Sequence, residues 1–174
     1  LHHLTGDAAA RFARTPREPD QLLEALEGTI TTIAAFAGLA AENMARGAGW
    51  RFLDLGRRIE RGIAIAQTAG GVMTGPPAQM EAGLRLALEL CDSTTAYLQR
   101  DPAGASYAEA LAFVLADRSN PRSLRYQLAR IERHLGALAA AGRPAESRIP
   151  ALIDAIDAFA RAAAPGAAAR ANAS

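Results

Sequence analysis

One stretch of this chain decides its fold: Gly49–Arg61, which reads GWRFLDLGRRIER. Apolar residues in and after it recur at intervals of three and four, so the stretch predicts a helix. Arg57 and Glu60 are three residues apart, and Arg57 and Arg61 are four apart, so the three charges form one patch on that helix. Such a patch either locks helices together or holds an anion.

The rest of the chain follows the same helical period, and no segment alternates with a period of two for long. The sequence therefore predicts an all-α fold, a bundle of six to seven mostly antiparallel helices in a single domain over residues 1–174. Glycine and proline mark the helix ends. We expect helices at about residues 5–14, 20–46, 48–68, 77–100, 106–116, from 121 onward and 149–163, with a frayed tail over 164–174.

Three apolar stripes are predicted to face the core. Cys91 is the only cysteine; it ends the third stripe and is expected to be buried. A lone cysteine forms no internal disulfide and fits a reducing compartment. We therefore expect a cytoplasmic protein. The stripes are Leu22, Leu23, Leu26, Ile30, Ile33, Phe36, Ala37 and Ala40; then Phe52, Leu55, Gly56, Ile59, Ile63 and Ala66; then Met80, Leu84, Ala87, Leu88 and Cys91.

Composition excludes several classes of protein. All nineteen basic residues are arginine, and without lysine the chain cannot form a Schiff base or a P-loop. The net charge of +1 gives no attraction to nucleic acid or to an anionic membrane, and no apolar stretch is expected to span a bilayer. No serine-hydrolase elbow, zinc motif or dimetal motif is present, so we expect no metal and no cofactor.

A second motif, around Asn120, Arg122 and Ser123, predicts a helix that starts at Pro121 with Asn120 as its cap. Exposed N–H groups at that start, with the arginine and the hydroxyl, can receive a carboxylate or phosphate. The alternative is a well-capped helix with a solvated arginine. Trp50 and Arg51 flank the first motif; packing is the usual role of such a tryptophan, and both join the candidate binding residues.

The two motifs together closely resemble the bacterial alpha-E domain. The resemblance is carried by residues 41–61, which read AENMARGAGWRFLDLGRRIER, and by 120–124, NPRSL, followed by Gln127-Leu128; it extends over about residues 12–159. That family is named for its predicted helices and its Glu-Arg motif, which Glu60-Arg61 would supply. The family domain normally begins with a further helical unit, so we expect this chain to be the C-terminal portion of a longer domain.

The resemblance implies partners. Alpha-E domains are fused to, or encoded beside, circularly permuted ATP-grasp proteins and transglutaminase-like proteins, in systems that make or modify peptide bonds, and ATP would enter only through such a partner. The chain is then an accessory domain that docks the ligase or positions a carboxylate-bearing peptide through Arg57, Glu60 and Arg61. Two alternatives are an enzyme component with Glu60 as acid or base, and a purely structural bundle in which Glu60 bridges arginines. A homodimer is also expected.

Overall fold

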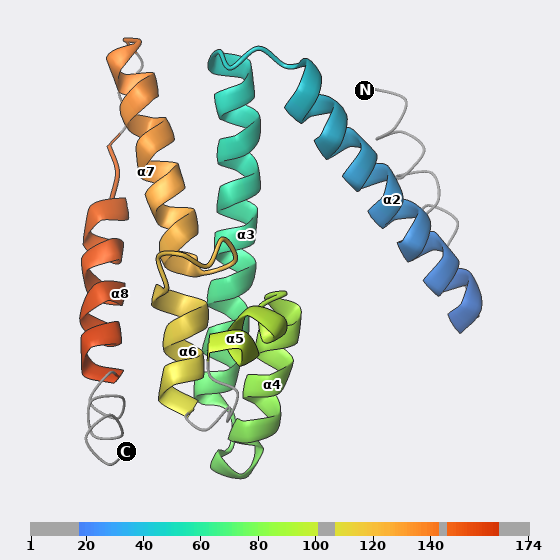
Figure 1. Cartoon of the computed structure of the whole chain (residues 1–174), viewed down its shortest axis with the longest axis vertical. Coiled ribbons are helices and arrows are strands. Elements are labelled where there is room, and N and C mark those ends of the chain that lie inside the picture. The colour runs from blue at the N-terminus through green and yellow to red at the C-terminus, as the bar shows by residue number, and fades with distance from the viewer. Residues whose placement is uncertain (1–17, 101–106, 143–145, 164–174) are drawn as a thin grey trace. The chain divides into compact units, whose positions relative to one another are not determined.

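The computed structural model describes residues 18–100, 107–142 and 146–163, and the predicted helix at 5–14 and tail at 164–174 lie outside them. In the described ranges the chain forms seven α-helices and no strand, which confirms the all-α prediction (Figure 1). The helices are α2 (Pro19–Asn43), α3 (Ala48–Thr74), α4 (Met80–Leu90), α5 (Thr94–Arg100), α6 (Tyr107–Ala116), α7 (Leu124–Ala140) and α8 (Ile149–Ala163), with a short 3-10 turn at Pro77–Gln79.

The chain divides into two compact units, residues 1–50 and 51–174. In the first unit, α2 exposes the apolar stripe that the sequence assigned to a core, with Ile30 66% and Ile33 60% exposed, and it buries only Ala40. By length and composition alone α2 also qualifies as a membrane span, so the expectation that no stretch reaches that length is wrong, although a core helix of a soluble protein passes the same test. The expected homodimer stays a prediction.

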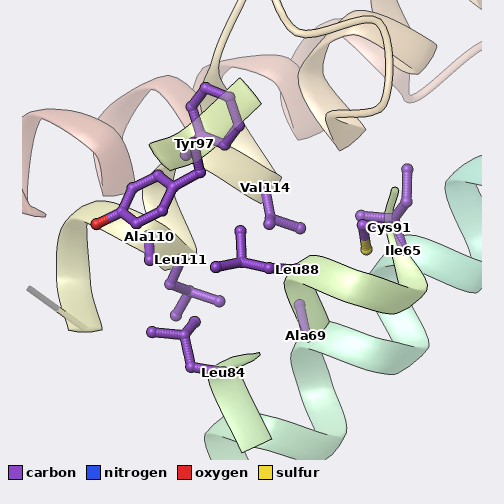
Figure 2. Packing of buried hydrophobic residues seen from close by; sticks show 10 residues of the cluster. Ile65, Ala69, Leu84, Leu88, Cys91, Tyr97, Ala110, Leu111 and Val114 are labelled. Carbon is purple, nitrogen blue, oxygen red and sulfur yellow. The ribbon is translucent and has the colours of Figure 1, made fainter. Parts of the chain in front are cut away.

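The main core lies in the second unit, where α3, α4, α5 and α6 meet (Figure 2). The predicted stripe that ends at Cys91 is buried at Leu84, Ala87, Leu88 and Cys91 and half-buried at Met80. Burial raises the pKa of the Cys91 thiol. A smaller cluster joins α7 to α8 through Leu128, Ile131 and Ile153. The buried residues of the main core are Ile65, Ala69, Leu84, Leu88, Cys91, Tyr97, Ala110, Leu111, Phe113 and Val114.

Helix α3 buries a different face from the one predicted. Phe52, Ile59 and Ile63, expected in the core, are 48%, 41% and 48% exposed. The buried positions are instead Asp54, Gly62, Ile65 and Ala69. The predicted stripe was wrong because it ranks positions by apolar character alone. Asp54 is stabilised in the interior by His134 on α7 and by Arg58 on its own helix. The face of α3 that packs in the bundle therefore combines one buried carboxylate with glycine and apolar positions.

Three helix boundaries also differ from the predicted ones. Helix α3 continues through Gly70-Gly71 to Thr74, because glycine inside a helix weakens it without necessarily ending it. The predicted helix at 77–100 is interrupted between α4 and α5, where Asp92 adopts a left-handed backbone with φ 48°. Helix α7 begins at Leu124 and not at Pro121, since the side chain of Ser123 caps it by accepting from the backbone N–H of Tyr126.

We expect the substitution Gly62→Ala to raise the free energy of unfolding by about 0.5–1 kcal/mol, because alanine favours the helical backbone over glycine. A Cβ at position 62 would lie 3.6 Å from Leu124 Cδ1 and 3.8 Å from Gln127 Cβ, which are ordinary contacts. Urea denaturation measures the change. Gly56→Ala, where nothing lies within 4 Å, is the control for helix propensity. If Gly62→Ala lost stability and Gly56→Ala did not, the close packing of α3 against α7 would require a residue without a side chain at position 62.

Candidate functional site

A chain of buried polar side chains joins α3 to α7, and we call this contact the α3–α7 seam. Asp54 and His134 share a hydrogen bond of 2.7 Å between Oδ2 and Nε2, and their side chains are 7% and 1% exposed. Arg58 on α3 forms an ion pair of 3.3 Å with Asp54 and donates to Gln127 Oε1 at 3.2 Å. Gln127 in turn donates to the carbonyl of Pro121 at 2.6 Å. The seam therefore fixes Arg58 and ties α3 to the start of α7.

The electrostatics of the seam favour a charged Asp54. Burial raises the pKa of this carboxyl, but the hydrogen bond with His134 and the charge of Arg58 outweigh burial and leave the pKa below its ordinary value. A buried carboxylate is tolerated only when it is paired and hydrogen-bonded, and Asp54 has both kinds of partner. Asp54 is thus committed to the structure and is not available to a ligand.

Two of the predicted binding residues, Asn120 and Ser123, make structural hydrogen bonds in the loop before α7. Asn120 is buried; its side chain donates to Ser93 Oγ at 3.1 Å and accepts from the backbone N–H of Arg122 at 2.9 Å. Ser123 is buried as the cap of α7 and donates to the carbonyl of Asp117. These contacts hold Arg122 at the loop surface, where it forms an ion pair of 2.6 Å with the exposed Asp92.

Four arginines gather at one end of the seam, and we call Arg57, Arg58, Arg61 and Arg122 the arginine cluster. The pKa of the Arg61 guanidinium lies below its ordinary value because of burial first, and then because of the positive charges of Arg122, Arg58 and Arg57. An arginine stays protonated even so. Within the part of the chain that the structure describes, Arg57 and Arg61 form no ion pair and no hydrogen bond through their side chains. The cluster therefore carries unpaired positive charge and is suited to an anion.

The remaining predicted site residues are not part of this cluster. Glu60 is exposed and makes no side-chain hydrogen bond or ion pair within residues 18–100, 107–142 and 146–163, so it does not bridge arginines there. Arg51 is half-buried. Trp50 belongs to the first unit, where the guanidinium carbon of Arg46 lies 4.5 Å from its ring centroid. The described residues include no cluster of three or more side chains able to hold a metal ion.

Sequence reasoning missed Asp54, Gln127 and His134. Spacing within one helix could not reveal the partner of His134, because Asp54 lies eighty positions away along the chain. One signal was available. Asp54, Arg58 and Arg61 follow one another at spacings of four and three, so they form a charged stripe next to the apolar one. A charged stripe of that length on a helix with an apolar stripe beside it indicates a polar contact inside the fold.

We expect the free energy of unfolding to fall as the pH drops below about 4. The pKa values of Asp54, Asp117 and Asp157 are raised by burial but lowered more by hydrogen bonds and neighbouring arginines, so each lies below its ordinary value. A carboxyl with a depressed folded-state pKa stabilises the fold above the unfolded value of about 3.9, and that contribution is lost as the pH falls through the folded value. Urea denaturation at pH 7, 5, 4 and 3 measures the effect. Equal stability at pH 5 and pH 3 would contradict it.

The comparisons with known proteins identify a family but no activity. A family model described as a predicted alpha-helical domain with a conserved ER motif matches residues 3–170. Uncharacterised proteins of Mycobacterium tuberculosis (strain H37Rv) and Mycobacterium bovis are each 33% identical over 141 residues, which cover 79% of this chain and 16% of the relative. The chain thus spans about a sixth of the length of these relatives. No solved structure matches it significantly.

Proposed function

Because the chain belongs to the Alpha-E family, we propose that it is a helical accessory domain of an ATP-grasp peptide ligase or peptide-modification system. In this role it binds carboxylates through the arginine cluster, either on the peptide that the ligase modifies or on the surface of the ligase itself. A circularly permuted ATP-grasp protein is the expected partner, and a transglutaminase-like protein is the second. The domain supplies binding and positioning, and ATP chemistry stays with the partner.

The observation that supports this proposal is the unpaired positive charge at the end of the seam. Arg61 is half-buried beside Arg122. The charge of Asp54 is the smallest of the influences on the pKa of Arg61, and neither Arg61 nor Arg57 forms an ion pair among the described residues. Guanidinium groups form paired hydrogen bonds with carboxylates, which makes arginine the preferred residue for such recognition. Arg58 supports the cluster from within because Asp54 and Gln127 fix its position.

Recognition fits the geometry better than acid–base catalysis by Glu60. A catalytic carboxyl acts together with groups that hold it and tune it. Glu60 is exposed, and among the residues that the structure describes no side chain hydrogen-bonds to it. Two members of the arginine cluster, in contrast, are held: Arg58 by the seam and Arg122 by its ion pair at the loop before α7.

Copurification tests the proposed function. The chain would be captured with the ATP-grasp protein encoded nearest its gene, and the affinity would be measured by calorimetry for wild type, Arg57→Gln and Arg61→Gln. We expect each substitution to weaken binding about tenfold or more, as for the loss of a charged hydrogen bond. Arg148→Gln, an exposed site ahead of α8, is the control with the same change of charge. No binding by folded wild type, or equal binding by all variants, would contradict the proposal.

A further inference from the structure

The tetrapeptide Arg-Ile-Glu-Arg occurs twice in the chain, at residues 58–61 in α3 and at 130–133 in α7. The two helices run antiparallel beside one another (Figure 1): Asp54 contacts His134 at one end of the seam, and Gly62 lies against Leu124 at the other. Moving along α3 toward its end therefore means moving along α7 toward its start. The two tetrapeptides lie next to one another across the seam, about one helical turn out of register.

Four arginines lie along one edge of this seam. Each comes one position before a residue that packs between the helices, and in an antiparallel pair the positions just before the packed residues fall on the same side of both helices. The pairs are Arg57 before Arg58, Arg61 before Gly62, Arg130 before Ile131, and Arg133 before His134. The edge thus receives arginines from α3 and from α7.

Tyr126 links an arginine of α3 to an arginine of α7. The guanidinium carbon of Arg58 lies 5.8 Å from the centroid of its ring, and that of Arg130 lies 6.0 Å from it. The arginines that begin the two tetrapeptides therefore share one aromatic neighbour. Their guanidinium carbons are no farther apart than the sum of these two distances.

The Arg130 side chain contains a hydrogen-bond donor that has no acceptor in the described residues. Its Nε is fully buried and has no acceptor among the residues that the structure describes. A buried donor without an acceptor destabilises the fold, because it has lost its hydrogen bond to water and gained none in return. Buried polar groups of this kind are uncommon and are often completed by a ligand, an ion or water. An acceptor that enters along the edge of the seam would satisfy this donor.

A count of charges indicates what that acceptor carries. Two buried or neighbouring carboxylates at this edge are already engaged in ion pairs. Asp54 is used by Arg58 and His134, and Asp92 by Arg122. Within the described ranges Arg57, Arg61, Arg130 and Arg133 form no ion pair with a carboxylate. They come from two helices, so the complementary charge is best placed on two separate groups.

We propose that this edge binds a peptide segment that carries two carboxylates, such as a C-terminal glutamate. One carboxylate lies at Arg57 and Arg61, and the other accepts from Arg130. This inference rests on the proposed function and narrows it, because it gives the second Arg-Ile-Glu-Arg segment a role in the same binding event. A phosphate group concentrates its charge on one centre and matches the two-helix arrangement less well.

Calorimetric titration of the full chain with two peptides tests the inference. Acetyl-Ala-Ala-Glu has two carboxylates, and acetyl-Ala-Ala-Gln has one. We expect wild type to bind the first at least about tenfold more tightly, as for one charged hydrogen-bonded contact. Arg130→Gln should remove that difference, whereas Arg61→Gln should weaken both peptides and Arg148→Gln neither. Circular dichroism of each variant checks folding, and Arg130→Lys, which keeps the charge but loses the planar fork, should restore only part of the difference.

The outcomes separate this inference from the proposed function. Equal affinity of wild type for the two peptides, or no binding of either, overturns the two-carboxylate site whatever the copurification experiment shows. Inorganic phosphate that binds more tightly than acetyl-Ala-Ala-Glu, and displaces it, also overturns it in favour of a phosphate site. A tenfold preference that Arg130→Gln abolishes supports the inference even if no ATP-grasp protein copurifies.

Discussion

Replacing Asp54 with alanine should lower the free energy of unfolding by about 3–5 kcal/mol, the usual cost of removing one partner from a buried charge pair. The side chain is 7% exposed and serves both Arg58 and His134. Without it, the Arg58 guanidinium, only 17% exposed, stays in the seam with no carboxylate. The hydrogen bond from His134 Nε2 is lost as well. Urea denaturation at pH 7 measures the change.

An exposed ion pair in the same unit is the matched control. Arg85 and Glu81 form a pair of 2.7 Å on α4, with side chains 76% and 82% exposed. Exposed pairs contribute about 0–1 kcal/mol, so Glu81→Ala should have a small effect. If Asp54→Ala cost no more than Glu81→Ala, the seam would not hold α3 to α7, and the position of the arginine cluster would need another explanation.

Replacing Leu111 with alanine should lower the free energy of unfolding by about 2–5 kcal/mol, because it leaves a cavity in the main core. Leu111 is 2% exposed and lies on α6 within the cluster that joins α6 to α3 and α4 (Figure 2). Its neighbours come from three helices, which limits how far the core can collapse to fill the space. Thermal and urea denaturation both report this loss.

Leu86 on α4 provides the comparison, since it is 53% exposed. Leu86→Ala removes the same atoms from a position near solvent, and surface substitutions change stability by about 0.5 kcal/mol or less. A similar loss in both variants would mean that the exposed face of α4 is covered in solution. It would also favour the expected homodimer, which light scattering would then detect.

The helical class and most of the helices could be predicted from the sequence, since period, glycine and proline are local signals. The prediction of the core stripe that ends at Cys91 was correct because no polar contact competes with its apolar positions. The stripe of Phe52, Ile59 and Ile63 was wrong because the face that packs depends on what the neighbouring helix offers. That information lies about seventy to eighty residues farther along the chain.

The candidate site could be predicted in part. Local spacing placed Arg57 and Arg61 on one patch, and the loop motif pointed to Arg122. Spacing could not show that Arg122 lies close enough to Arg61 to lower the pKa of its guanidinium, because this depends on how α3 and the loop before α7 meet. Nor could it show that the side chains of Asn120 and Ser123 make structural hydrogen bonds, Asn120 with Ser93 and Ser123 with the first turn of α7. The buried donor of Arg130 is a property of packing alone.

The central claim is that the unpaired arginines of the α3–α7 seam bind carboxylates, and arginine side-chain NMR tests it most directly. The full chain, labelled with nitrogen-15, would be titrated with acetyl-Ala-Ala-Glu while the Nε–H signals are followed. The account predicts that the signals of Arg61 and Arg130 move with a shared saturation curve. It also predicts that the signal of Arg58, already held by Asp54 and Gln127, and that of exposed Arg148 stay in place. Signals of Arg61 and Arg130 that do not move, or move no more than that of Arg148, would contradict it.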